Sequence, residues 1–453
     1  MTDDTQTYNL PVKKIEHAVK LSYAQAMLGA IYSASVGGMF LIGYALKLGA
    51  NNAQIGLMSS VPMLFVWVHL ITAALVERGI SRRLLTVVGA LGNVLGWVFI
   101  ILIPYVARDA SPSVKVFALI TIITMVTIFA YVSGNARSSW VGDLIPASFR
   151  GTFFGRLTMY AGLIGTAFAL IEGRFLDIVQ AHGIGAYSVL FGFGIIIGLI
   201  NSSLFIPQAD VPVQQKATAP GAFRQYVREA FANKSLIAAM FYALFWSLQA
   251  IAGPFYATYM IRDLKLPFLG IGIVNAMVTF SMLFCSPLWG RMIDRYGCRP
   301  ILIFCTFGMV PIPLIWLFIG PDHAHLVYWL VAPINLLGGF FVAGISVGLN
   351  TLVYKITPSI GRSVQFAIYS IIVTLAAAPM PWLGGYLTDI LHRWPWVDLR
   401  ITFYATILFV FIAAIIARSI RESGSKHTGE LMRNLSTHLM RPTAAPQHEP
   451  AES

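Results

Sequence analysis

The chain has 453 residues, of which 57% are hydrophobic and 11% are charged, with a formal net charge of +12 and a mean hydropathy of +0.73. This composition excludes an array of soluble domains and places most of the chain in lipid, where only helices and closed barrels satisfy the backbone. Apolar runs of about 20 residues predict helices rather than barrel strands, and basic residues scattered through short loops do not indicate nucleic-acid binding.

Hydrophobic runs predict an all-α polytopic protein with twelve transmembrane helices. The spans are expected at residues 19–46, 53–76, 83–107, 114–142, 150–178, 184–207, 235–262, 267–289, 300–319, 326–354, 363–391 and 399–419. Residues 1–18 are polar and show no cleavable signal, so the first span is expected to direct membrane insertion.

The distribution of Lys and Arg predicts the orientation. Most of the 31 basic residues fall in segments on the same side as the N-terminus. Because basic loops stay in the cytoplasm, both termini are expected to be cytoplasmic, in a multi-pass protein of the cytoplasmic (inner) membrane. Cys285, Cys298 and Cys305 lack the spacing of a disulfide framework or a zinc site, and no cofactor or metal is expected.

The longest connection, residues 208–234, divides the chain into two six-helix halves, residues 19–207 and 235–420. They lie between a cytoplasmic N-terminus, residues 1–18, and a tail, residues 421–453, that is predicted to be disordered. Within the connection, Phe223, Val227 and Phe231 share a helical face beside Arg224 and Arg228. This pattern predicts an amphipathic helix on the inner membrane surface, or one packed under the helix bundle.

An internal repeat supports two related halves. Segments after spans 4 and 10 match at a spacing of 212 residues, and the loops after spans 2 and 8 match at a spacing of 217. The matched pairs are Pro146/Pro358, Arg150/Arg362 and Phe154/Phe366, then Glu77/Asp294, Arg78/Arg295 and Arg82/Arg299.

The loop between spans 8 and 9, residues 290–300, reads GRMIDRYGCRP. Gly290 and Gly297 are expected to permit a tight turn, and Asp294 to accept hydrogen bonds from a neighbouring helix N-terminus. The pattern G-x-x-x-D-R-x-G-x-R resembles the loop signature of the major facilitator superfamily. A basic loop that only fixes topology is the alternative interpretation.

The resemblance extends over residues 15–420 and implies a solute pathway between the halves, with alternating access by rocking of one half against the other. The first-half signature departs from the family pattern, with Ala73 for the leading glycine and Glu77 for the aspartate. The resemblance also implies a cytoplasmic gate, in which Asp294 meets the start of span 5 and Glu77 meets the start of span 11. The gate residues are Glu77, Arg78, Asp143, Arg150, Gly290, Asp294, Arg295, Gly297, Arg299 and Arg362.

Few ionisable residues fall within the spans, and each carries a functional hypothesis because a charge in hydrocarbon is costly. Arg137 would either attract an anionic substrate or join the inner gate. His69 would either bind a coupling proton or donate to a carbonyl between helices. Glu172 would either bind a coupling proton or form an interfacial ion pair with Arg174.

Span 7 carries a polar and aromatic face, made of Tyr242, Trp246, Gln249, Gly253 and Tyr256, with Pro254 expected to kink it. The face predicts either lining of the substrate pathway or ordinary helix packing. Further candidates for the pathway are Asn275 and Thr279 on span 8, Asn335 and Asn350 on span 10, and Gln365 and Tyr369 on span 11.

These features favour a secondary active transporter for a small organic solute. Its expected partners are the lipid bilayer, the solute and a coupling proton or ion, and it is expected to act as a monomer. A membrane-embedded enzyme is disfavoured, because no nucleophile–base pair or set of metal ligands shares one depth. A transporter-like receptor or assembly factor without turnover is the alternative.

Overall fold

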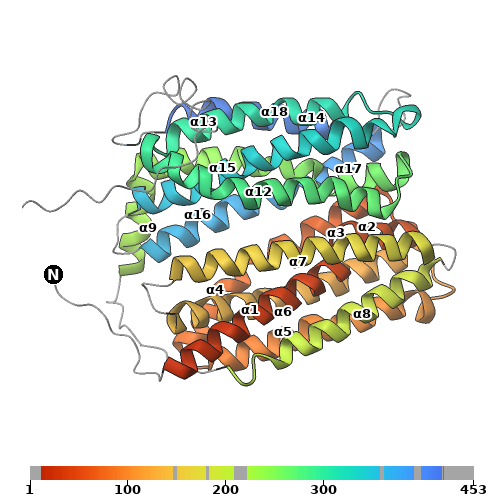
Figure 1. The fold of residues 1–453 in the computed structure, drawn as a ribbon, viewed down its shortest axis with the longest axis horizontal. Helices are drawn as coiled ribbons and strands as arrows, with labels where there is room; N and C mark the ends of the chain where they lie inside the picture. Colours follow the sequence, from red (N-terminus) through yellow and green to blue (C-terminus); the bar gives the residue numbers. More distant parts are fainter. Residues whose placement is uncertain are drawn as a thin grey trace, which may run out of the picture.

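Every regular element in the described part of the chain is a helix, and the helices form two bundles side by side (Figure 1). The computed structural model describes residues 12–145, 150–179, 183–208, 222–357, 362–391, 399–420 and 422. The helices are α1 (Val12–Val36), α2 (Gly38–Lys47), α3 (Asn52–Leu64), α4 (Val68–Glu77), α5 (Arg82–Val106), α6 (Pro112–Leu144), α7 (Arg150–Val179), α8 (Ile184–Ser203), α9 (Ala222–Ala232), α10 (Lys234–Ser247), α11 (Gly253–Thr258), α12 (Phe268–Tyr296), α13 (Cys298–Met309), α14 (Pro311–Trp316), α15 (Ala332–Ile356), α16 (Arg362–Ala377), α17 (Met380–Leu391) and α18 (Ile401–Ala417).

The predicted class, an all-α multi-pass membrane protein, is confirmed. Among the described residues, eleven helical stretches are long and apolar enough to cross a membrane, and α18 is a shorter twelfth apolar helix. Large apolar side chains stand on the lateral surface of the bundles, including Phe99, Phe284, Phe318 and Trp329, each more than 60% exposed. Such a surface is stable only in lipid. Several spans are interrupted, so that one span comprises α1 and α2, another α3 and α4, and another α16 and α17.

The two bundles consist of α1–α8 and α9–α18, and two helix pairs make the main contacts between them. Span 5 (α7) packs on span 8 (α12), and α3 of span 2 packs on α17 of span 11. We use "inner" for the face where α1 begins and "outer" for the opposite face, following the predicted orientation.

The segment predicted as an amphipathic helix is helical, as α9. It packs against α10 and α16, and Ala230 is buried in a cluster with Leu236, Met240 and Val353. The helix therefore lies under the C-terminal bundle, which was one of the two alternatives. The side chains of Phe223 and Arg224 lie outside the described residues.

The tight turn expected from residue 290 onward is wrong. Helix α12 continues to Tyr296, because Met292, Ile293 and Tyr296 bury one helical face in the core of the C-terminal bundle. Gly290 is an ordinary helical residue with open space where a Cβ would stand. Only Gly297, with φ 92°, makes the turn into α13 and needs the left-handed region open to glycine.

Candidate functional site

Spans 1 and 7 are both broken near the middle of the bundle. Helix α1 ends at Val36, and α2 begins at Gly38, which has a φ of 52°. In span 7 the α-helix gives way to a 3-10 helix, η3 (Leu248–Ala252), before α11 resumes at Gly253. Gly37 and Gly253 are 216 residues apart, close to the repeat spacing. Interruptions at corresponding positions of two halves are typical of binding sites in transporter folds.

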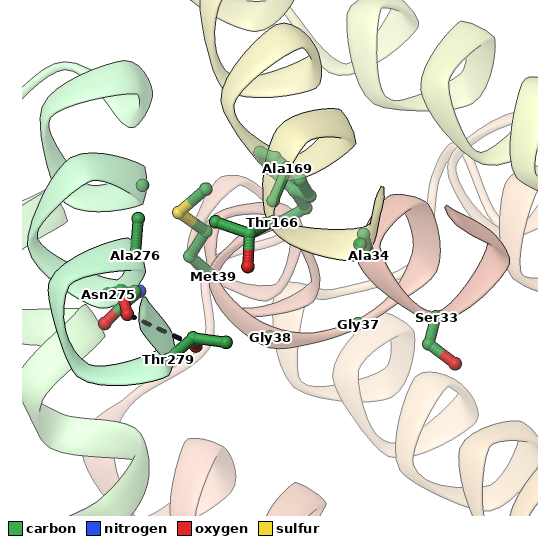
Figure 2. A pocket seen from close by; sticks show the side chains of 13 residues that line it. Ser33, Ala34, Gly37, Gly38, Met39, Thr166, Ala169, Asn275, Ala276 and Thr279 are labelled. Carbon is green, nitrogen blue, oxygen red and sulfur yellow. Dashed lines mark hydrogen bonds between the residues drawn. The ribbon is translucent and has the colours of Figure 1, made fainter. Parts of the chain in front are cut away.

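Two adjoining hollows lie at these breaks. The first, of about 200 Å³, lies between α1, α7 and α12, and its polar lining includes Ser33, Thr166 and Thr279 (Figure 2). The second, of about 390 Å³, lies between α2, span 7, α12, α14 and α15. Gly38, Met39 and Asn275 line both hollows, so we treat them as one central cavity.

The central cavity is apolar and aromatic, with a few amide groups. Gln249, Asn275 and Asn335 supply the amides, and Tyr256 and Trp316 supply aromatic surface. Tyr256 also stacks on Phe403, with ring centroids 4.5 Å apart. No Asp, Glu, Lys, Arg or His is among the described residues that line either hollow. The cavity therefore offers hydrogen bonds and dispersion contacts without a fixed charge.

Six of the residues predicted for the pathway line this cavity, namely Gln249, Gly253, Tyr256, Asn275, Thr279 and Asn335. They come from span 7, α12 and α15, so elements far apart in sequence meet here. The Asn335 side chain donates to the carbonyl of Val274, 3.1 Å away, which fixes it against α12.

Four other predicted residues, Tyr242, Trp246, Gln365 and Arg137, do not line either hollow. Tyr242 is fully buried in the C-terminal bundle, with 2.7 Å between its hydroxyl and that of Thr306, and Trp246 packs at the edge of the same core. Gln365 is 1% exposed. The Arg137 guanidinium lies over the ring of Phe205, 5.5 Å from its centre, within the N-terminal bundle.

His69 and Glu172 lie outside the central cavity. The His69 ring lies 4.9 Å from that of Tyr131, and its backbone carbonyl accepts a 2.6 Å hydrogen bond from the side chain of Asn135. Glu172 is only 4% exposed and faces Ser35 of α1, whereas Arg174 is exposed. The interfacial ion pair expected between Glu172 and Arg174 is therefore wrong, because the two side chains point to different environments.

Two carboxylates at the outer face join the bundles, and sequence reasoning missed both roles. Asp177 at the end of α7 accepts hydrogen bonds from the backbone N–H groups of Phe268 (2.7 Å) and Leu269 (2.9 Å), the first residues of α12. Asp389 of α17 accepts from the backbone N–H of Ala53 (2.8 Å) and the side chain of Asn52 (2.7 Å), at the start of α3. We call Asp177 and Asp389 with these partners the outer latch.

The outer latch follows the internal repeat. Asp177 and Asp389 are 212 residues apart, the spacing already found for the pairs around Arg150 and Arg362. Each caps a helix of the opposite bundle, where orphan N–H groups and the helix dipole favour an anion. The repeat spacing was the available signal, but it does not show which helix each carboxylate meets.

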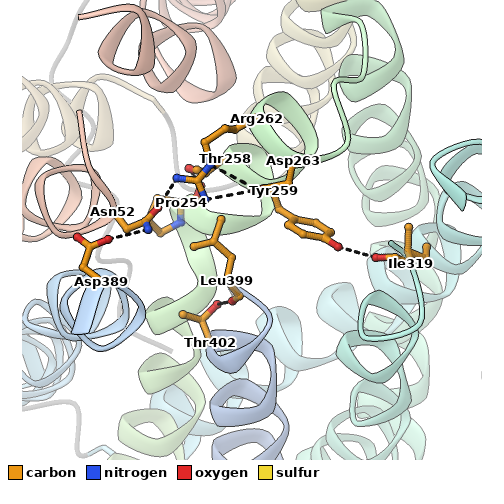
Figure 3. A network of polar contacts seen from close by, with 10 residues as sticks. All are labelled: Asn52, Pro254, Thr258, Tyr259, Arg262, Asp263, Ile319, Asp389, Leu399 and Thr402. Carbon is orange, nitrogen blue, oxygen red and sulfur yellow. Dashed lines mark hydrogen bonds and ion pairs between the residues drawn. The ribbon is translucent and has the colours of Figure 1, made fainter. Parts of the chain in front are cut away.

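Further contacts strengthen closure at the outer face. Arg262 donates to the side chain of Asn52, 2.8 Å away, and so joins span 7 to span 2 (Figure 3). A Cβ added to Gly56 would stand 2.2 Å from the carbonyl oxygen of Pro381, and one added to Gly385 would stand 2.1 Å from that of Asn52. Helices α3 and α17 are therefore in backbone contact, which only glycine allows.

The predicted inner gate stays a prediction, because the side chains of Glu77, Asp143, Arg150 and Arg362 lie outside the described residues. Asp294 is exposed and forms no hydrogen bond with the described part of the chain.

The loop around Arg299 is tied instead to its own half. Its backbone N–H donates to Glu422, and its guanidinium to the carbonyl of Arg418, each at 2.8 Å. Lys355 pairs with Glu422 at 3.1 Å. Of the other predicted gate residues, Arg78 stands at the end of α4 and the Arg295 guanidinium lies 5.5 Å from the ring centre of Tyr296.

The chain resembles known proteins both in sequence and in fold. The sequence profile of the Major Facilitator Superfamily matches residues 235–439. The Quinolone resistance protein NorA of Staphylococcus aureus is 25% identical over 135 residues, and the Multi-drug resistance efflux pump PmrA of Streptococcus pneumoniae is 26% identical over 145 residues. These alignments cover 30% and 32% of this chain, and a third (33%) of each relative.

Solved structures match over most of the chain. The D-xylose-proton symporter superposes with a TM-score of 0.70 at 14% identity, covering 91% of this chain and 100% of that one. A variant of the nucleoside transporter NupG gives 0.68 at 13% identity, covering 89% and 100%. A bacterial homologue of the iron transporter ferroportin, in an inward-facing state, gives 0.64 at 14% identity, covering 91% and 99%. At these identities the likeness concerns the fold.

Proposed function

We propose that the chain is a secondary active transporter of the major facilitator superfamily, which moves a small organic solute by alternating access. The observation that carries this proposal is the central cavity at the breaks of spans 1 and 7, between bundles joined at the outer face by the latch. A rocking motion of one bundle against the other would break the outer latch and open the cavity to the outer face.

The cavity lining favours an uncharged or weakly charged, partly aromatic solute. Amides of Gln249, Asn275 and Asn335 would pair with its polar groups, while Tyr256 and Trp316 would stack on its rings. The names of the relatives, a quinolone resistance protein and a multi-drug efflux pump, make a quinolone, which is an aromatic compound, a reasonable first probe. An anionic solute held by Arg137 is less well supported, because this side chain does not line the cavity.

The direct test is solute flux in proteoliposomes, with a fluorescent quinolone as the first probe. The same probe should stabilise the purified protein against heat, since a ligand that binds only the folded state raises its melting temperature. A receptor or assembly factor without turnover would show the stabilisation but no flux. Both termini would lie in the cytoplasm, and a monomer would suffice, since the cavity lies within one chain.

Gln249→Ala is expected to raise the apparent KM for the quinolone roughly tenfold, because one hydrogen bond to a solute contributes about 1–1.5 kcal/mol. Folding should be unaffected, since the side chain faces a cavity. The matched control is Asn350→Ala, because this predicted pathway residue lines neither hollow. Among the described residues, its exposed amide donates to the carbonyl of Ser346 in its own helix. Initial rates of transport across a range of concentrations measure the effect. Equal KM values in both variants would place the solute elsewhere.

Asp294→Asn is expected to shift the protein toward the inward-facing state by about 1 kcal/mol, the energy of a charge at a helix terminus. The reason is the proposed contact between Asp294 and the start of span 5 when the inner face is closed. Labelling of a cysteine near the outer face by an impermeant reagent should fall in this variant. Unchanged labelling would show that Asp294 takes no part in an inner gate.

A further inference from the structure

Glu172 lies where three spans meet. Its own helix, α7, packs on α1 and on α12, and Ser35, its partner, stands in the last turn of α1 before the break at Gly37. The next residue, Gly173, lies against the first turn of α12, where a Cβ would be 3.1 Å from the backbone N of Leu269. A change in the protonation of Glu172 therefore affects two elements together: span 1 at its break, and α12, which Asp177 of the outer latch holds.

The hydrogen bonds around Glu172 determine its protonation. The Ser35 hydroxyl lies 2.5 Å from Glu172 Oε1 and 2.9 Å from the carbonyl oxygen of Ile31. A hydroxyl has one hydrogen and cannot donate to both acceptors. If the carboxyl carries a proton, Glu172 donates to Ser35 and Ser35 donates to Ile31, and both contacts are satisfied.

An ionised Glu172 would be poorly compensated in this arrangement. Its Oε2 atom is buried and has no hydrogen-bond partner among the described residues. A buried carboxylate with one donor is strongly destabilising, whereas leaving the carbonyl oxygen of a neutral carboxyl group unpaired costs much less free energy.

The charged and titratable groups around Glu172 do not supply a counter-charge. On its own helix, Arg174 is exposed, and Asp177 is bound to the N-terminus of α12. The facing stretches of α1, residues 29–36, and of α12, residues 268–279, carry no charged residue, and the neighbouring α8 carries none. Their titratable side chains are tyrosines, Tyr32 and Tyr187.

We propose that Glu172, held by Ser35, is a proton-binding site that couples protonation to closure of the outer face. In the outer-closed arrangement the carboxyl group is protonated. When the bundles move, water in the cavity reaches it, the O–H bond breaks with its electron pair left on the carboxylate, and the proton passes to water. This proposal deepens the proposed function by assigning the site of the coupling proton.

Two measurements without any transported solute test the site. The first is infrared absorption of the purified protein, in which a protonated carboxyl group gives a C=O stretching band that a carboxylate lacks. A band that titrates with pH and is missing in Glu172→Gln is expected. Its presence at full strength in Glu172→Gln would overturn the assignment.

The second measurement is outside labelling of Met260→Cys in a variant whose native cysteines are replaced by alanine. Met260 is 2% exposed and lines the cavity close to the outer face, so an impermeant thiol reagent reaches it only when that face opens. Labelling, normalised to the unfolded protein at each pH, should rise with pH. For a one-proton switch the rise is at most about tenfold per pH unit.

Glu172→Gln is expected to give low labelling at every pH, because glutamine mimics the neutral carboxyl group. Asp177→Asn is the matched control, which should raise the labelling at all pH values but keep its pH dependence. A pH dependence that survives in Glu172→Gln would overturn the proposal. Failure of the quinolone flux, with the pH response intact, would reject that solute and leave the proton site standing.

Discussion

Asp177→Asn combined with Asp389→Asn is expected to shift the protein from the outer-closed toward the outer-open conformation by roughly 2–4 kcal/mol. Each carboxylate accepts two hydrogen bonds at the start of a helix in the opposite bundle. Asparagine keeps the shape but removes the charge and one acceptor, at a cost of about 1–2 kcal/mol per site. The ratio of closed to open protein would then fall by a factor of about 30 to 1,000.

Outside labelling of Met260→Cys measures this shift directly. The two single variants should each give part of the effect, and their energies should add, because Asp177 and Asp389 contact different helix pairs. Asp322→Asn is the matched control, since Asp322 is an exposed carboxylate that forms no hydrogen bond with the described residues. Labelling of the double variant equal to that of Asp322→Asn would mean that the latch contributes nothing to outer closure.

Composition and hydropathy were sufficient for the class and the span count, because length and apolarity decide whether a helix crosses a membrane. They did not indicate the break at Gly37 and Gly38. The residues on both sides of the break are apolar, and two glycines hardly change a hydropathy value that is averaged over a whole span. The same limitation affected span 7. A face extrapolated at 100° per residue from Tyr242 to Tyr256 assumes a continuous α-helix, and the 3-10 stretch at Leu248–Ala252 changes the register.

The contacts of the outer latch could not be predicted from a single sequence. The repeat spacing relates Asp177 to Asp389, but which helix each carboxylate caps depends on how the bundles pack. Glu172 was recognised as a candidate because a carboxyl group within a span is unusual. Its partner Ser35 lies 137 residues earlier in the chain, and no local pattern joins the two.

Gly56→Ala and Gly385→Ala are each expected to prevent full closure of the outer face. The added methyl carbon would stand 2.2 Å or 2.1 Å from a backbone carbonyl oxygen of the other bundle, too close for any rotamer change to relieve. Overpacking of this kind costs about 1–3 kcal/mol. Because α3 and α17 must then separate, the hydrogen bonds from Asn52 and Ala53 to Asp389 should be lost with the contact.

A double-mutant cycle separates this mechanism from general destabilisation. If Gly56→Ala already breaks the Asp389 cap, then adding Asp389→Asn should raise Met260→Cys labelling little further, whereas adding Asp177→Asn should raise it fully. Gly192→Ala is the control, because nothing lies within 4 Å of a Cβ at that helical position, and its labelling should match the parent. Independent, additive effects of Gly56→Ala and Asp389→Asn would show that the glycine contact and the carboxylate cap do not act as one closure between α3 and α17.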